Sequence, residues 1–240
     1  MNTAILKHKC LATGIHLSLS LAVFAVALYL ILAVWYPGLL FHIDGGWQGV
    51  RIMIAVDLVL GPLLTFIVFN PSKPKREIKL DLSLIALVQI AALCWGFWAV
   101  NHVKPLALAY GNGAFQSVVA EELEIQEQSP ADIENFGPSP VLIFGREPAN
   151  GEESAGVAAY EMLEGIPPSK LVFLWEPLTD NMDAVEALSA DALKQEFPDK
   201  ADAIEQLPGK LVRFQGRYGY GVMALSESGE WLDSLVLTTY

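Results

Sequence analysis

Histidine and cysteine are scarce in this chain of 240 residues, and neither occurs after residue 102. Without them, the rest of the chain cannot form a Ser-His-Asp triad, a Cys-His dyad or the usual zinc sites. Cys10 and Cys94 cannot meet without displacing a helix, so no disulfide is expected. The second half of the chain therefore has few of the side chains that catalysis and metal binding ordinarily use.

Charged residues are also few, at 18% of the chain, whereas an average soluble domain has roughly 25%. Residues 1–103 contain seven Lys and Arg against four Asp and Glu, and residues 104–240 contain eight against twenty-three. An apolar, slightly basic half joined to a strongly acidic half is not a single soluble globule. The acidic half also argues against nucleic acid as a partner, because phosphates would be repelled.

The first half contains three long apolar runs: Ile15–Tyr36, Val50–Phe69 and Leu82–Val100. At 1.5 Å per residue, each run can cross a hydrocarbon core of roughly 30 Å. The first run is longer than the core of a signal peptide and lacks an Ala-x-Ala site, so we interpret it as an uncleaved anchor. We predict a three-span transmembrane domain over residues 15–103, with helices at about 15–36, 50–69 and 82–102, embedded in a lipid bilayer.

Basic residues predict the orientation of these spans. Lys and Arg lie before the first run and in the loop 70–81, whereas the loop Pro37–Gly49 has none. By the positive-inside rule, residues 1–14 and the loop 70–81 are cytoplasmic. Residues 104–240 then form an acidic domain outside the cytoplasm.

Short apolar runs alternate with polar turns in residues 104–240, which favours a soluble α+β domain. We expect strands at Leu106–Ala109, Ala114–Leu123, Pro140–Phe144 and Lys170–Trp175, and helices between Ser129 and Gly137, over Ala155–Glu164 and across 183–207. The runs that follow alternate regularly around turn residues and predict a C-terminal antiparallel β-meander over Lys210–Tyr218, Tyr220–Leu225 and Glu230–Thr239.

No catalytic, cofactor-binding or metal-binding motif is expected. The glycine-rich stretches 111–113 and 216–221 do not match G-x-G-x-x-G, and the acids of 180–191 lack the central glycine of a calcium loop. Two alternatives stay open: a membrane-tethered enzyme that uses a pair of carboxylates, and a regulatory subunit whose outer domain senses a ligand.

Asp57 is the most informative residue of the apolar half. A carboxylate at the centre of a bilayer costs about 2.5–3.5 kcal/mol on insertion scales, so it is expected to face a polar partner rather than lipid. Gly61 and Thr65 follow at four-residue intervals, on the same face of a helix. Pro62 lies beside them and frees a backbone carbonyl. We predict that Asp57, Gly61, Pro62 and Thr65 form a docking face for a partner's transmembrane helix.

The other two runs carry polar side chains at a comparable depth. Ser20, Thr65 and Gln89 fall within about one helical turn of each other, which favours a polar tier among the three helices. Ala92 and Gly96 follow Gln89 as a small-residue face for helix packing. Two interpretations remain: these faces only join the three spans, or one stays free for a foreign helix.

Several motifs of the first half resemble the type IV pilin accessory proteins (TfpX/TfpZ type). They are His16-Leu-Ser18, Trp35-Tyr36-Pro37-Gly38, Gly45-Gly46-Trp47, Val56–Thr65 and Phe69-Asn70-Pro71. The resemblance covers about residues 7–105, and the Asp-x-x-x-Gly-Pro-Leu-Leu-Thr run is its most specific part. It implies a non-enzymatic, cofactor-free inner-membrane protein of a Gram-negative bacterium with a periplasmic C-terminal domain. Such a protein assists pilin stability and pilus assembly like a chaperone, with the major pilin's transmembrane helix and head as its partner.

Overall fold

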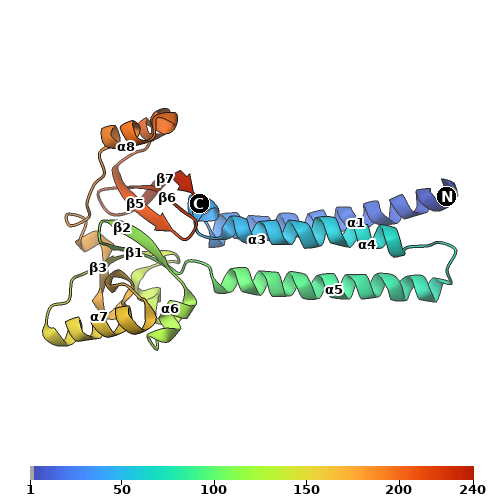
Figure 1. The fold of residues 1–240 in the computed structure, drawn as a ribbon, viewed down its shortest axis with the longest axis horizontal. Coiled ribbons are helices and arrows are strands. Elements are labelled where there is room, and N and C mark those ends of the chain that lie inside the picture. Colours follow the sequence, from blue (N-terminus) through green and yellow to red (C-terminus); the bar gives the residue numbers. More distant parts are fainter. Residues whose placement is uncertain (1–2) are drawn as a thin grey trace. The chain divides into compact units, whose positions relative to one another are not determined.

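The computed structural model describes residues 3–240, which form two compact units (Figure 1). The first unit is Met1–Val34 with Trp47–Asn101, and the second is Trp35–Gly46 with His102–Tyr240. The segment that joins the first two long helices therefore belongs to the second unit. The apolar runs of the sequence do not predict this assignment.

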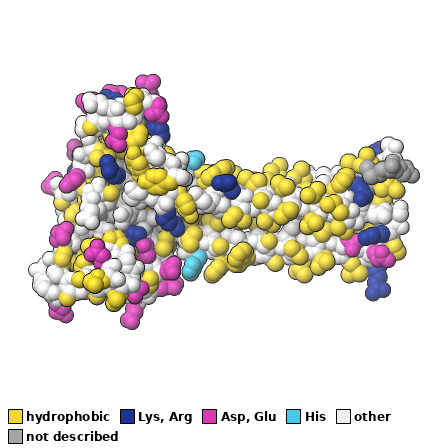
Figure 2. All heavy atoms as spheres, in the orientation of Figure 1, with side chains coloured by type: hydrophobic (Ala, Val, Ile, Leu, Met, Phe, Trp, Pro, Cys, Tyr) yellow, Lys and Arg dark blue, Asp and Glu magenta, His cyan; other side chains and the backbone are white. Residues whose placement is uncertain are grey.

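Three long helical rods make up the first unit. Their bounds are α1 (Thr3–Leu30) with a π-helical turn (Ile31–Trp35), α3 (Gly46–Met53) with a π-helical stretch (Ile54–Leu60) and α4 (Gly61–Val68), and α5 (Lys75–His102). Each rod is long and apolar enough to be a candidate membrane span, and hydrophobic side chains cover their surfaces (Figure 2). The first and third rods begin well before the expected spans, because polar residues at their ends are also helical.

The π-helical stretch of the second rod ends at Leu60, two residues before Pro62. Proline has no N–H to donate, so a regular α-helical hydrogen bond to the carbonyl of Leu58 is lost. The chain widens here by one residue, and the Gly61 N–H donates to the carbonyl of Val56, five positions back. The wide turn includes Asp57, and π-helical turns of this kind are frequent at functional sites.

A seven-stranded mixed sheet forms the framework of the second unit, in the order β4-β3-β1-β2-β5-β6-β7. Its strands are β1 (Ala107–Gly111), β2 (Ala114–Val118), β3 (Val141–Gly145), β4 (Trp175–Pro177), β5 (Lys210–Gly216), β6 (Gly219–Leu225) and β7 (Trp231–Thr239). The pairs β1–β3 and β2–β5 are parallel, and the other neighbours are antiparallel. The expected C-terminal strands are present and pair antiparallel as β5–β6–β7. They belong to a larger mixed sheet and do not form a separate meander.

Short helices lie in the segments of the chain that connect the strands of the sheet. They are α6 (Ala120–Ile125), α7 (Gly151–Glu164), α8 (Ala190–Glu196) and α9 (Ala201–Glu205). The expected helix over 183–207 is instead two short helices, separated by a 3₁₀ turn that begins at Pro198. Leucine, isoleucine and valine of α8, α9 and β5–β7 form one apolar core, and residues of β1–β3 with Leu123 and Trp175 form another.

Two expected strands are partly or wholly wrong. The strand expected over Ala114–Leu123 ends at Val118, and α6 follows. The run Lys170–Trp175 forms 3₁₀ turns up to Leu174. The amide of Gln126 donates to the carbonyl of Lys170 at 3.1 Å and accepts from the N–H of Val172 at 2.9 Å. A side chain therefore satisfies the backbone groups that a neighbouring strand would otherwise pair.

Candidate partner-binding groove

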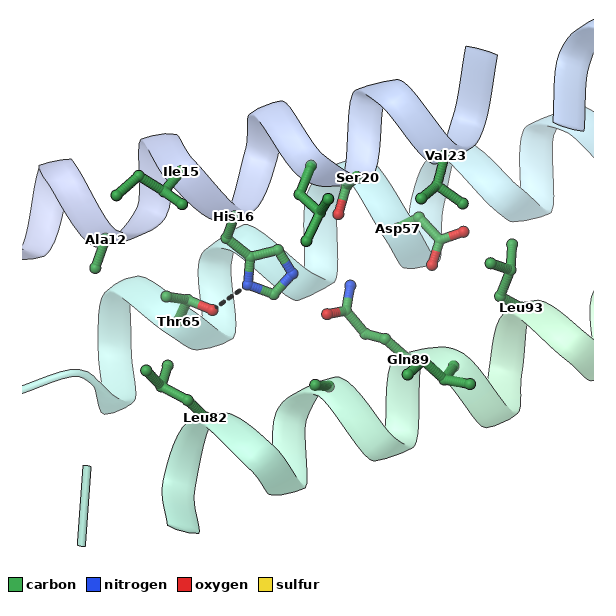
Figure 3. Close-up of a pocket in the computed structure, with 13 residues that line it drawn as sticks. Ala12, Ile15, His16, Ser20, Val23, Asp57, Thr65, Leu82, Gln89 and Leu93 are labelled. Carbon is green, nitrogen blue, oxygen red and sulfur yellow. Dashed lines mark hydrogen bonds between the residues drawn. The ribbon is translucent and has the colours of Figure 1, made fainter. Parts of the chain in front are cut away.

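An open cavity of about 430 Å³, here called the groove, lies among the three rods of the first unit (Figure 3). Most of its lining is aliphatic, including Leu19, Val23 and Ile90. Its polar lining residues come from all three rods and are His16, Ser20, Asp57, Thr65 and Gln89. Four of these five were selected from the sequence, so residues from separate apolar runs do meet at one place.

Asp57 is 7% exposed and lines the groove. In Figure 3 its carboxylate points into the space among the helices. Among residues 3–240, no side chain or backbone group forms a hydrogen bond or an ion pair with it. No Lys or Arg lies in the described lining either. A buried carboxylate without a partner is unfavourable in a protein interior and more so in a membrane.

Thr65 forms its side-chain hydrogen bond with another residue of the same unit. It is 1% exposed, and its Oγ1 lies 2.6 Å from Nδ1 of His16 on α1 (Figure 3). This hydrogen bond joins α1 to α4. Ser20 and Gln89 line the same groove, but in the described part of the chain none of Ser20, Thr65 and Gln89 bonds another member of that group.

Gly61 and Pro62 are both buried. A Cβ atom at Gly61 would lie 1.8 Å from Nε2 of Gln89, so the glycine provides the space into which that side chain extends. The Gly61 surface is therefore covered by α5 of the same chain. Of the predicted docking face, Asp57 is the residue whose polar group forms no hydrogen bond within the described part of the chain.

Ala92 and Gly96 of α5 are half-buried. A Cβ atom at Gly96 would meet nothing within 4 Å. The small-residue face of α5 thus stays open next to Gly96, whereas the matching position on α4 is filled. The sequence could not distinguish these two glycines, because both sit in apolar helices at regular spacing.

His16 was not selected as a site residue from the sequence. It belongs to one of the motifs quoted above, and it lies one helical turn before Ser20 on the same face of α1. That spacing was the signal that could have identified it. Lys9 was also missed: its Nζ donates to the carbonyls of Phe66 and Ile67 at 3.1 and 3.2 Å, at the C-terminal end of α4.

A second polar cluster lies inside the second unit, around the fully buried Asp44. Its Oδ1 accepts from the Ser117 hydroxyl at 3.0 Å and from the backbone N–H and Nε of Arg217 at 3.3 and 3.2 Å. Arg217 also donates to the carbonyl of Val103 at 2.8 Å. Burial raises the pKa of the Asp44 carboxyl, although the guanidinium of Arg217 favours its charged form.

The segment 35–46, here called the strap, is attached to the sheet by further contacts. The N–H of Tyr218 donates to the carbonyl of Ile43 at 2.8 Å, and the N–H of Leu39 to the hydroxyl of Ser234 at 3.3 Å. A Cβ atom at Gly216 would lie 2.4 Å from the carbonyl oxygen of Ile43. Glycine at the β5–β6 turn therefore allows the strap to approach the sheet closely.

The acidic side chains of the second unit bear on the two alternatives that the sequence leaves open, an enzyme and a ligand sensor. No group of three His, Cys, Asp or Glu side chains able to hold a metal ion occurs in residues 3–240. A hollow of about 630 Å³ has Asp183, Glu227 and Lys210 in its lining, and the amine of Lys210 donates to the carbonyl of Met182 at 2.7 Å. This polar hollow differs from the deep apolar pocket expected of a ligand sensor.

The chain is similar to three proteins of Dichelobacter nodosus. It is 38% identical over 98 residues to a fimbrial assembly protein of serogroups C1 and C2, covering 41% of this chain and 75% of that protein. It is 29% identical over 190 residues to the fimbrial assembly protein of serogroup I, covering 77% and 72%. It is 36% identical over 98 residues to that of serogroup E1, covering 41% and 38%. No family model and no solved structure matches the chain.

Proposed function

The chain belongs to the family of fimbrial assembly proteins, and we propose that it is an inner-membrane accessory protein of type IV pilus assembly, of the TfpX/TfpZ type. In this proposal it acts like a chaperone on the major pilin before assembly. The groove of the first unit binds the pilin's transmembrane helix, and the acidic second unit meets the pilin head. Neither role requires catalysis.

The observation that carries the proposal is the buried carboxylate of Asp57, which forms no hydrogen bond or ion pair among residues 3–240, in an otherwise mainly aliphatic groove. A helix-packing role alone would leave such a group paired with a neighbouring helix, as Thr65 is paired with His16. A foreign helix can bring the missing polar partner. The open surface around Gly96 supports the same reading, because small residues allow close approach of a helix.

The proposed orientation has structural support. The strap and residues 102–240 fold into one compact unit, so both lie on the same side of any membrane that the rods cross. The loop between α4 and α5 then lies on the opposite side. That loop and the first turns of α5 carry Lys73, Lys75, Arg76 and Lys79, which favours the cytoplasm for this side and the periplasm for the second unit.

Site-specific photo-crosslinking tests the proposal in cells that make the cognate pilin. A crosslinking amino acid replaces Leu19, which lines the groove, or Leu21, which is exposed two residues away outside the groove lining. We expect a pilin adduct from position 19 and little from position 21. Equal labelling from both positions, or none from position 19 while the protein is inserted and folded, would contradict helix docking in the groove.

A second measurement uses Asp57→Leu, with Val59→Ala as its matched control on the exposed side of the same stretch. We expect Asp57→Leu to reduce co-purification of pilin and the number of pili, while Val59→Ala changes neither. Unchanged pilin binding and piliation in Asp57→Leu would overturn the proposed role of Asp57.

A further inference from the structure

We infer that the groove selects its partner helix through a hydrogen-bond donor, an ammonium, guanidinium or amide N–H, placed to meet the carboxylate of Asp57. This inference rests on the proposed function, and it adds the chemistry that the partner must carry. The groove lining combines two kinds of surface. Its aliphatic residues can pack against any apolar helix, whereas the carboxylate of Asp57 requires a hydrogen-bond donor.

The groove lining has few polar groups, and among the described residues none of them forms a hydrogen bond with Asp57. Asp57 accepts only, while His16 already shares its Nδ1 contact with the Thr65 hydroxyl at 2.6 Å. Gln89 is the only amide of the described lining, and Lys and Arg are absent from it. An incoming carboxylate or an aliphatic side chain at this depth would leave Asp57 unsatisfied, whereas an N–H donor would pair with it.

The burial of Asp57 makes the choice selective. At 7% exposure, the carboxylate has lost most of its contact with solvent, and a hydrogen bond to a charged group is stronger than one between neutral groups. Replacing the donor by an apolar group removes that bond without releasing the carboxylate to water. The groove therefore discriminates against a helix without the donor, in addition to attracting one that has it.

The position of the donor along the partner helix also follows. Asp57 is the eighth residue of the apolar run Val50–Phe69, so it lies roughly 10 Å from the start of that run by helical rise. The donor of the partner is expected at the same depth, nearer the end of the membrane that faces the second unit. Val23 and Leu93 lie near Asp57 in Figure 3, and Leu19 and Ile90 line the same groove. The partner residues that flank the donor are therefore expected to be apolar.

The experiment uses the full-length protein in vesicles of phosphatidylethanolamine and phosphatidylglycerol. Synthetic transmembrane peptides of leucine and alanine carry Lys, Gln or Leu at a depth of roughly 10 Å from the periplasmic interface. Binding is measured by energy transfer between a labelled peptide and a label on the protein. We expect the Lys and Gln peptides to bind about tenfold more tightly than the Leu peptide.

Two variants make the result specific. In Asp57→Leu, the advantage of the Lys and Gln peptides over the Leu peptide should disappear. Asp57→Asn preserves the shape of the side chain, so it should fold normally, keep part of the Gln advantage and lose most of the Lys advantage. Equal binding of all three peptides to the natural protein, or an advantage that survives in Asp57→Leu, would overturn the inference.

The outcome separates this inference from the proposed function. If the peptides bind equally but pilin still crosslinks from position 19, the groove docks pilin without selecting a donor. If the donor peptides are preferred but pilin does not crosslink, the groove binds a helix other than that of pilin. A Lys advantage without a Gln advantage would identify the required donor as cationic.

Discussion

The carboxylate of Asp44 accepts three hydrogen bonds from Arg217, a residue 173 positions further along the chain. Asp44 lies in the strap between the first two rods, and Arg217 lies in the turn between β5 and β6. Asp44 is fully buried, and the Arg217 side chain keeps 35% exposure. The pair therefore fastens an early segment of the chain to a sheet built mainly from late ones.

Removing one member of this pair should destabilise the second unit. In Asp44→Ala the guanidinium of Arg217 loses its partner, so we expect a loss at the lower end of the roughly 3–5 kcal/mol typical of buried pairs, because Arg217 is partly solvated. Chemical unfolding of the full-length protein in detergent measures the change. Asp202→Asn, on the exposed start of α9, is the control and should stay within about 0.5 kcal/mol. A double replacement by leucine should cost less than Asp44→Ala; an equal or greater cost would contradict this account.

The two glycines of the first unit should respond differently to enlargement. Gly61→Leu forces Gln89 out of its space, because even a Cβ atom would lie 1.8 Å from Nε2, so we expect lower thermal stability in detergent. A Cβ atom at Gly96 would meet nothing within 4 Å. Gly96→Leu should therefore leave stability nearly unchanged while reducing pilin binding. Gln89→Ala should restore much of the stability of a Gly61→Ala protein. Equal destabilisation by the two leucines would argue against the packing described for α5.

The hydrogen bond between His16 and Thr65 should contribute to the association of α1 with α4. Thr65→Val keeps the shape and removes the hydroxyl, so we expect a loss of about 0.6–2 kcal/mol, measured by thermal or denaturant unfolding in detergent. Ser18→Ala is the control, since that exposed hydroxyl donates to the carbonyl of Gly14 in its own helix at 2.9 Å. A Thr65→Val protein as stable as the Ser18→Ala protein would contradict a structural role for this bond.

Acid should weaken the attachment of α7 through Glu153. The bidentate hydrogen bonds from Arg146, at 2.7 and 2.9 Å, and a further one from the N–H of Ala149 lower the pKa of Glu153 from 4.5 to about 2. Because the folded-state pKa is depressed, the stabilisation is complete above about pH 4.5 and is lost as the pH falls towards 2. The thermal midpoint of the natural protein should exceed that of Glu153→Gln above pH 5, and the two should converge near pH 2. Glu152→Gln should run parallel to the natural protein; a Glu153→Gln curve that also runs parallel would contradict this assignment.

The length of the apolar runs was sufficient to predict the long helices. Helical spacing alone selected Asp57, Thr65 and Gln89, and the structure places all three in the lining of one groove. A carboxylate in an apolar run is unfavourable when it faces lipid. Asp57 could therefore be selected as a site residue without any knowledge of the tertiary structure. The details of pairing did require it. Gly61 and Gly96 look alike in the sequence, yet only Gly61 faces Gln89, because the relative rotation of two helices is not encoded in the period of either one.

The second unit was harder to predict for a related reason. The apolar run Lys170–Trp175 is typical of a strand, but Gln126 supplies the hydrogen bonds that would have come from a neighbour. The pairing of Asp44 with Arg217 has no local signal at all, since a single buried ion pair leaves neither a period nor a motif. Strands of β5–β7 were predictable because their partners are adjacent in the sequence.

The strap has a consequence for biosynthesis. Residues 35–46 leave the ribosome long before the β5–β6 turn is synthesised. Asp44 therefore stays hydrated and without the hydrogen bonds of Arg217 until Arg217 has been made and is in the same compartment. Any translocation of the C-terminal region must therefore precede closure of the unit. A nascent chain halted between these two points therefore cannot form the hydrogen bonds that join Asp44 to Arg217.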